Sequence, residues 1–204
     1  MRFNSDHMNQ PSESIDQLVH LCLRGDQNGF AALYENCAPM IYRLCYGLLM
    51  NREDAEDVMQ EAFVYAFRNL YRFDPKKASF RTWLYTIALS RCRNVYRRSR
   101  WARVASLLSI ELSAPYSEAP EARLADHDAK AVIEKALSAL TPRLREAVVL
   151  RYGHGLTFRE MAEIIGCPQK TAESRVRLAH EQLRTVLQPS GEYLLSELIG
   201  IEYS

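Results

Sequence analysis

Residues 52–103 reverse the sign of their charge midway through two consecutive helical patterns, and this reversal constrains the chain more than any other feature. Over residues 52–68, apolar side chains recur at the i, i+3, i+4, i+7 spacing of one buried helical face: Ala55, Val58, Met59, Ala62, Phe63, Ala66 and Phe67. Asn51 stands where an N-cap is expected. The spacing therefore predicts an amphipathic helix whose outward face carries Glu53, Glu56, Asp57, Gln60 and Glu61. A plain solvated helix face would show the same pattern.

Basic and aromatic residues dominate the segment that follows. Residues 68–103 contain eleven Lys and Arg residues and one acid, Asp74, although the whole chain carries only +1. Ser79 is placed to cap a second helix with the buried stripe Phe80, Trp83, Leu84, Ile87, Ala88, Cys92 and Val95. The rings off this stripe or in the preceding loop are Tyr71, Phe73, Tyr85, Tyr96 and Trp101. Cations beside exposed rings suit single-stranded nucleic acid, because rings stack on unpaired bases; a protein-binding surface is the alternative.

The helical patterns divide the chain into two units, which predicts an all-α fold of two helical domains. The first unit covers residues 14–103, and the second covers residues 127–188. Residues 104–126, rich in Ser, Ala, Glu and Pro, predict a flexible linker, and residues 189–204 form a tail of unknown role. The opposite charges of the first helices and the two basic units would allow a closed form of the free chain.

The second unit carries a helix-turn-helix pattern. Thr157 and Glu160 form a capping box, the helix they begin stops at Gly166, and another helix follows. Advancing about 100° per residue from the buried stripe of that last helix places four side chains outward: Lys170, Ser174, Arg177 and Glu181. The residues beside them are Thr171, Glu173 and Arg175. Such a helix can enter a major groove and read base edges, although protein docking is an alternative use.

Composition and missing motifs exclude several classes of protein. No apolar run approaches the ~18–20 residues that span a membrane, and residues 1–11 lack the apolar segment of a signal peptide, so a cytoplasmic location is expected. The five cysteines include no C-x-x-C pair and lie on apolar helical patterns, which predicts buried thiols and neither metal nor cofactor. No Gly-rich phosphate loop, nucleophile elbow or H-E-x-x-H motif is present, so an enzyme is not expected.

Specific segments in both units resemble one family. Residues 54–63 (Asp-Ala-Glu-Asp-Val-Met-Gln-Glu-Ala-Phe), residues 80–88 (Phe-Arg-Thr-Trp-Leu-Tyr-Thr-Ile-Ala) and Arg97-Arg98 resemble region 2 of bacterial sigma factors of the extracytoplasmic-function type. Residues 140–175 are similar to region 4 of the same family through Leu140-Thr141-Pro142, Arg145-Glu146, Leu150-Arg151-Tyr152, Gly155-Leu156-Thr157, Gly166-Cys167-Pro168 and Ser174-Arg175. Both regions occur in the family's order.

The resemblance implies a transcription initiation factor that joins core RNA polymerase and opens promoter DNA. It implies that the acidic helix docks on the β′ clamp helices through Asp54, Glu56, Asp57, Gln60 and Glu61. It implies that the loop and the basic helix capture the minus-10 strand through Arg72, Lys76, Lys77, Arg81, Tyr85, Ser90, Arg93 and Arg97. It implies that the second unit touches the β-flap and reads the minus-35 element through Lys170, Thr171, Glu173, Ser174, Arg175 and Arg177. An anti-sigma factor is a further partner that the family allows.

Two other interpretations stay open. A sigma-like decoy would occupy an anti-sigma factor without directing transcription, but it would have little use for the basic loop residues Arg72, Lys76 and Lys77. A stand-alone helix-turn-helix regulator would bind intact duplex without polymerase. The chain also departs from the usual pattern at Leu89-Ser90 and at Lys170, which bears on base preference.

Overall fold

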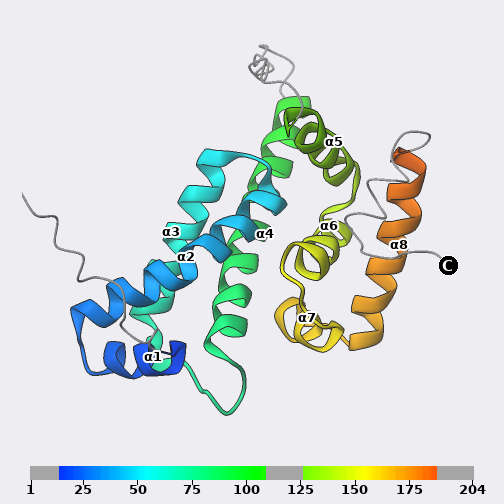
Figure 1. Cartoon of the computed structure of the whole chain (residues 1–204). Coiled ribbons are helices and arrows are strands. Elements are labelled where there is room, and N and C mark those ends of the chain that lie inside the picture. The colour runs from blue at the N-terminus through cyan, green and yellow to red at the C-terminus, as the bar shows by residue number, and fades with distance from the viewer. Residues whose placement is uncertain (1–13, 109–125, 188–204) are drawn as a thin grey trace, which may run out of the picture.

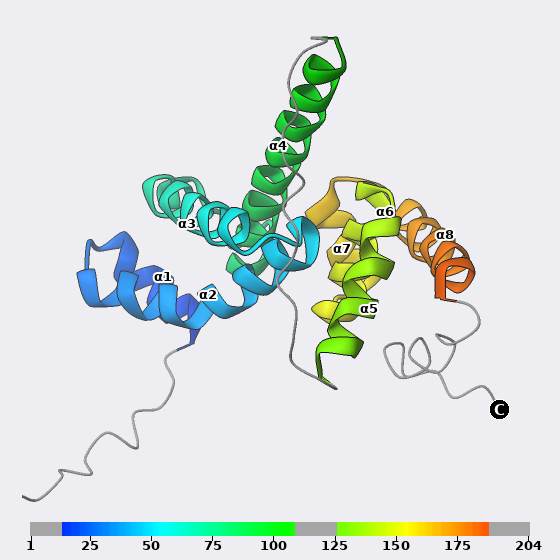
Figure 2. The same ribbon diagram turned by 90° about the horizontal axis from the view of Figure 1, so that it is seen from above.

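The computed structural model describes residues 14–108 and 126–187, and every regular element in these ranges is helical. The first half contains α1 (Ile15–Leu23), α2 (Gln27–Leu49), α3 (Arg52–Arg68), the 3-10 turn η1 (Leu70–Arg72) and α4 (Phe80–Leu108). The second half contains α5 (Asp126–Ala139), α6 (Pro142–Val148), the π-helical turn η2 (Val149–Gly153), α7 (Phe158–Ile165) and α8 (Gln169–Leu187). The halves lie side by side (Figure 1), and α4 runs between α3 and the second half (Figure 2). The predicted all-α fold of two helical units is confirmed.

Local capping signals begin the helices where the sequence predicts. The Asn51 side chain accepts a hydrogen bond at 3.0 Å from the backbone N–H three residues later, and the Ser79 hydroxyl does the same at 3.1 Å. In the capping box of α7, a Glu160 carboxylate oxygen accepts from the Thr157 N–H at 2.8 Å. The Thr157 hydroxyl in turn accepts from the Glu160 N–H at 3.3 Å. Helices α3, α4 and α7 therefore start at predicted residues, because unpaired N–H groups there find partners.

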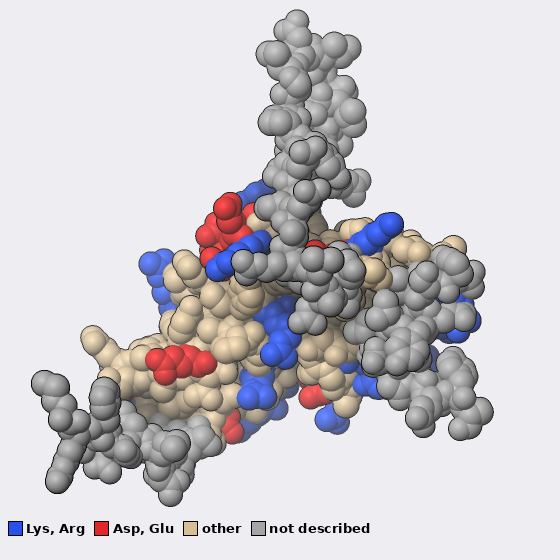
Figure 3. Space-filling model, turned by 45° about the horizontal axis from the view of Figure 1, so that its top comes forward, with Lys and Arg blue, Asp and Glu red and all other residues tan. Residues whose placement is uncertain are grey.

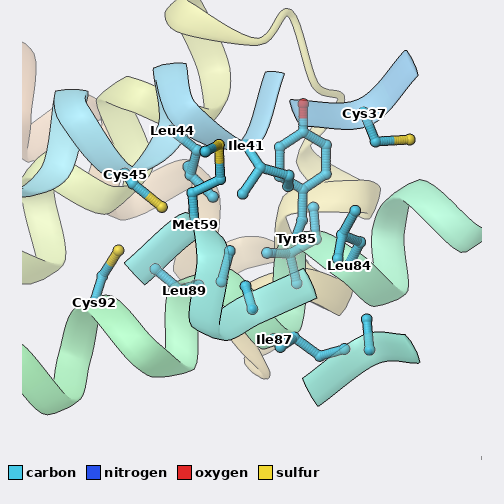
Figure 4. Close-up of a cluster of buried hydrophobic side chains, with 14 of the residues drawn as sticks. Cys37, Ile41, Leu44, Cys45, Met59, Leu84, Tyr85, Ile87, Leu89 and Cys92 are labelled. Atoms are coloured by element: carbon cyan, nitrogen blue, oxygen red, sulfur yellow. The ribbon is translucent and has the colours of Figure 1, made fainter. Parts of the chain in front are cut away.

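Helices α2, α3 and α4 form the core of the first half, because each presents an apolar face to the others. Leu44 of α2, Met59 of α3 and Leu84 of α4 meet in this core (Figure 4). Six of the seven apolar residues predicted on the buried face of α3 are buried, and Phe67 is half-buried. The packing fixes the outward direction of the acidic side chains on α3.

The cysteines occupy the core, as the sequence predicts. Cys22, Cys37, Cys45 and Cys92 are buried, and Cys167 is half-buried. Cys45 of α2 and Cys92 of α4 face each other across the core (Figure 4). Burial raises the pKa of the Cys22 thiol to about 11. A hydrogen bond with Cys45, together with burial, raises the pKa of the Cys92 thiol. These groups are therefore neutral thiols of low reactivity near neutral pH.

The second half contains the predicted helix-turn-helix. Helix α7 ends at Gly166, whose φ of 75° gives the left-handed turn that glycine adopts without strain. Met161 and Ile164 of α7 pack against Val176 of α8, and Leu183 of α8 packs with residues of α5 and α6. This packing places α8 along one side of the molecule (Figure 1).

The two halves share one continuous apolar core at a junction formed by α2 and α4 of the first half with α6, η2 and α7 of the second. Val149 fills the space beside Gly47, where an added Cβ would lie 3.1 Å from the Val149 Cγ1 atom. The charge pattern allows a closed form through attraction between the acidic helices and the basic units. The structure is closed, and the described contacts at its junction are buried apolar side chains and an ion pair between Arg93 and Glu146.

One predicted boundary also differs from the structure. Helix α4 continues to Leu108, so residues 104–108, predicted as linker, are helical. The segment Val-Ala-Ser-Leu-Leu contains neither Gly nor Pro, so nothing in it terminates the helix. The rest of the predicted linker up to residue 125 and the predicted tail 189–204 lie outside the described residues. Within the described ranges, no helix is both long and apolar enough to cross a membrane.

Candidate binding surfaces

The outward face of α3 is an acidic surface, defined by Asp54, Glu56, Asp57, Gln60 and Glu61. Four of these side chains are exposed. The fifth, Glu56, is half-buried and accepts a hydrogen bond from Arg52 at 2.9 Å. On the face shown in Figure 3, a compact group of Asp and Glu side chains has Lys and Arg side chains directly beside it, and more Lys and Arg side chains lie near the middle of this face. The acidic surface is thus available to a basic partner, as the sequence predicts.

A cleft of about 720 Å³ connects the acidic surface of α3 with α4. Glu61 Oε2 lies 4.0 Å from Arg91 Nη1, and the Arg91 guanidinium lies 4.8 Å from the centre of the Tyr65 ring. Exposed ion pairs contribute little to stability, so this contact leaves Glu61 free to exchange partners. The arrangement places the acidic surface directly beside the start of the basic one.

The loop between α3 and α4 presents an exposed ring among cations. Tyr71 is 69% exposed, and the Arg72 Nε donates to its hydroxyl at 2.9 Å. Lys76 and Lys77 are exposed in the same loop. Phe73 instead packs against the rings of Phe80 and Trp83, with centroids 5.6 and 5.5 Å apart. Phe73 therefore anchors the loop, while Tyr71 is available to stack on a base.

Only some of the predicted binding residues of α4 are exposed to solvent. Arg81, Ser90 and Arg97 are exposed. Tyr85 is only 5% exposed, and Arg93 is half-buried against the second half of the molecule. The prediction that Tyr85 lies off the buried face is wrong in this structure, and Tyr96 is half-buried. The stripe of α4 was derived from its own half alone, whereas the second half covers a further face.

A hydrogen bond between Tyr85 and His154 crosses this junction at 2.9 Å. Burial raises the pKa of Tyr85 to about 12, so its hydroxyl keeps the proton. Burial and the charge of Arg43 lower the pKa of His154 to about 4, so the imidazole is neutral and its Nδ1 can accept a hydrogen bond from the Tyr85 hydroxyl. The pair therefore joins the halves without a charge and does not titrate near neutral pH.

The predicted binding residues of α8 fall into an exposed group and a half-buried group. Lys170, Ser174 and Arg177 are exposed, and the residues half-buried beside them are Thr171, Glu173 and Arg175. Arg177 Nη1 donates to Glu181 at 2.8 Å across an exposed helical turn, a contact that costs little to break. A matching carbonyl or phosphate could therefore take the place of Glu181.

Known proteins with similar sequences identify the family of this chain. Residues 33–102 match the family model for sigma-70 region 2, and residues 130–183 match that for sigma-70 region 4. The chain is 31% identical to the ECF RNA polymerase sigma factor SigW of Bacillus subtilis over 182 residues, which cover 85% of this chain and 97% of the relative. The chain belongs to the extracytoplasmic-function group of the sigma-70 family.

Other similar proteins and structures support the same family assignment for this sigma factor. The RNA polymerase sigma-H factor of Pseudomonas aeruginosa is 32% identical, with 87% of this chain and 95% of the relative covered. The structure of CnrH in complex with the cytosolic domain of CnrY matches with a TM-score of 0.62 at 27% identity, covering 87% of this chain and 99% of that one. RpoE in complex with the anti-sigma factor NepR from Bartonella quintana has the same TM-score at 24% identity and shows the fold alone. Promoter-specific initiation of transcription is the function of this sigma factor.

Sequence reasoning missed the residues that hold the two regions together. Arg145 and Glu146 are 8% and 2% exposed, and both contact the first half. Two adjacent charges followed by Ala147, Val148 and Val149 signal a buried segment, since charged residues in such a run need partners. The partners themselves lie far away in the sequence and cannot be read from it.

Proposed function

We propose that this sigma factor binds core RNA polymerase with the acidic surface of α3 and promoter DNA with the loop, α4 and α8. The observation that carries the proposal is the adjacency of two surfaces of opposite charge on α3 and α4, joined at Glu61 and Arg91. The acidic surface suits basic side chains of the β′ clamp helices, because complementary charges guide association and fix its register. The β-flap is the proposed contact of the second half.

The loop and α4 are proposed to hold the non-paired minus-10 strand. Arg72, Lys76 and Lys77 would contact phosphates, and Arg81, Ser90 and Arg97 would extend the contact along α4. Tyr71 would stack on an unpaired base, which is favourable for every base because each has a π-face. Tyr85 and Arg93 would join this surface only after the second half has moved away. The binding free energy of these contacts would offset the few kcal/mol that base extrusion costs.

Loss of the exposed ring should impair promoter opening. Tyr71→Ala removes a stacking contact of about 1–3 kcal/mol, so we expect about a five- to 150-fold loss of open complex. Tyr71→Phe keeps the ring and should stay close to wild type. The fluorescence of 2-aminopurine placed in the minus-10 element measures opening; equal opening with both variants would remove Tyr71 from the proposed site.

Helix α8 is proposed to read the minus-35 element, with Arg177 in contact with a base. Arg177→Ala should change discrimination at one base pair by about 1–3 kcal/mol, because a good bidentate contact has that magnitude. Competition between promoters that differ at single minus-35 positions measures the change. A uniform loss over all sequences would instead assign Arg177 to a phosphate.

The cytoplasm is the proposed location, because core polymerase and promoter DNA are found there. An anti-sigma factor is a further proposed partner. The support is that CnrH and RpoE, which share this fold, form complexes with CnrY and with the anti-sigma factor NepR.

Transcription by a reconstituted enzyme tests the proposal. Purified chain and core polymerase should together give a specific run-off transcript from a cognate promoter, and neither component alone should give one. Gel shifts with and without core enzyme separate the proposal from a stand-alone regulator, which would bind intact duplex equally well in both cases. A chain that binds core enzyme but never yields a specific transcript would favour the decoy.

A further inference from the structure

Glu146 and Arg93 form a bidentate ion pair across the junction of the two halves. Arg93 Nε donates to Glu146 Oε1 at 2.9 Å, and Arg93 Nη2 donates to Glu146 Oε2 at 2.7 Å. Glu146 lies on α6 and is 2% exposed, whereas the Arg93 side chain on α4 is 40% exposed. The pair raises the pKa of Arg93, so the cation is held firmly. Two parallel hydrogen bonds between a guanidinium and an anion are also the geometry by which arginine binds phosphate.

The neighbouring residue, Arg145, makes a second contact between the two halves. Its Nη1 donates to the carbonyl oxygen of Leu48 near the end of α2 at 2.9 Å, and Tyr96 of α4 also donates to that oxygen. Its Nε and Nη2 donate to carbonyl oxygens of its own half, those of Leu137 and Leu140, at 2.8 and 3.3 Å. Arg145 is therefore built into the second half, and its contact with α2 positions Glu146 opposite Arg93.

Positive charge surrounds Glu146 on both sides of the junction. A cleft of about 1000 Å³ opens there, lined by Arg93 and Arg97 from α4 and by Arg143 and Arg175 from the second half. Arg175 Nη1 is buried and has no hydrogen-bond partner among the described residues. Glu146 is the single carboxylate lining this cleft. Without it, two pairs of arginines would face each other across the junction with no anion between them.

We propose that Glu146 keeps the free sigma factor closed by occupying Arg93 in the place of a DNA phosphate. The inference rests on the proposed role of Arg93 in strand binding. In the closed chain neither Arg93 nor Tyr85 can bind DNA, because Arg93 is bonded to Glu146 and Tyr85 is bonded to His154. Separation of the halves, as polymerase binds each of them at its own surface, releases Arg93 to the minus-10 strand. Strand binding and closure thus compete for the same guanidinium.

Removal of the Glu146 charge tests this competition in the full-length free chain. Glu146→Gln keeps the side-chain size but leaves the facing arginines without their anion, so we expect a larger radius of gyration in small-angle X-ray scattering. We also expect affinity for a labelled single strand carrying the non-template minus-10 sequence to rise about fivefold or more, since a hydrogen-bonded charge no longer competes. Glu163→Gln removes the same charge from an exposed position of α7 and should change neither quantity.

A second variant separates closure from strand binding. Arg93→Gln should also expand the chain but give no gain in strand affinity, because it removes the phosphate-binding group itself. Circular dichroism melting establishes that each variant is folded, and Arg93→Gln tests closure should Glu146→Gln not fold. A folded Glu146→Gln or Arg93→Gln chain as compact as wild type would overturn the inference. An expanded Glu146→Gln chain without gain in strand affinity would support the closure and overturn the DNA role of Arg93.

Discussion

Reversal of Asp57 and Glu61 to lysine is expected to weaken binding to core RNA polymerase by at least tenfold. The two residues lie one helical turn apart on the exposed face of α3, so both would meet the same basic surface of the partner. Each reversal replaces an attraction by a like-charge contact, which costs several kcal/mol at a well-formed interface. Titration of labelled sigma factor with core enzyme measures the loss.

The effect should come from the interface and not from misfolding. Both side chains are exposed, and the 4.0 Å pair between Glu61 and Arg91 is weak, so the free energy of unfolding should change by about 0.5 kcal/mol or less. Asp16→Lys combined with Glu35→Lys makes the same change in net charge at exposed positions of α1 and α2 and serves as the control. Equal loss in both double variants would show that net charge, and not the acidic surface of α3, governs binding.

Phe80→Ala should cause the largest loss of stability among the substitutions considered. The Phe80 side chain is 1% exposed at the start of α4, and its ring lies 5.6 Å from Phe73 and 5.9 Å from Trp83. Loss of a buried phenyl group costs about 3–5 kcal/mol, a large part of a typical stability of about 5–15 kcal/mol. Urea denaturation followed by circular dichroism measures the change.

The same substitution should also disturb the loop that presents Tyr71. Phe73 holds that loop by packing on Phe80 and Trp83, so loss of the Phe80 ring removes its anchor. Val64→Ala, on a side chain that is 49% exposed, is the matched control and should change stability by about 0.5 kcal/mol or less. A loss below about 1 kcal/mol for Phe80→Ala would mean that the ring cluster does not organise the start of α4.

Features encoded within a few residues could be predicted from the sequence. The caps at Asn51, Ser79 and Thr157 involve partners three residues away, and the structure confirms all three. The outward faces of α3 and α8 follow from helical period alone, so their exposed residues were also predicted. Resemblance to sigma factors then assigned these faces to partners, which periodicity cannot do.

Features that depend on distant segments could not be predicted. The contact of Glu146 with Arg93 joins residues 53 positions apart, and that of Arg145 with Leu48 joins residues 97 apart. For the same reason Tyr85 was expected to lie off the buried face, although it is buried and hydrogen-bonded to His154 of the second half. Charge opposition allows a closed chain, but it does not say which residues meet at the junction. The halves are held by apolar burial at Gly47 and Val149 and by the ion pair between Arg93 and Glu146.

Permanganate oxidation of unpaired thymines tests the central claim most directly. The account predicts that core polymerase with this sigma factor makes minus-10 thymines of a cognate promoter reactive, and that replacement of Tyr71 by Ala reduces this reactivity while promoter binding persists. Promoter DNA that is bound and transcribed at the correct start site with the same thymine reactivity after loss of Tyr71 and the loop lysines would contradict it.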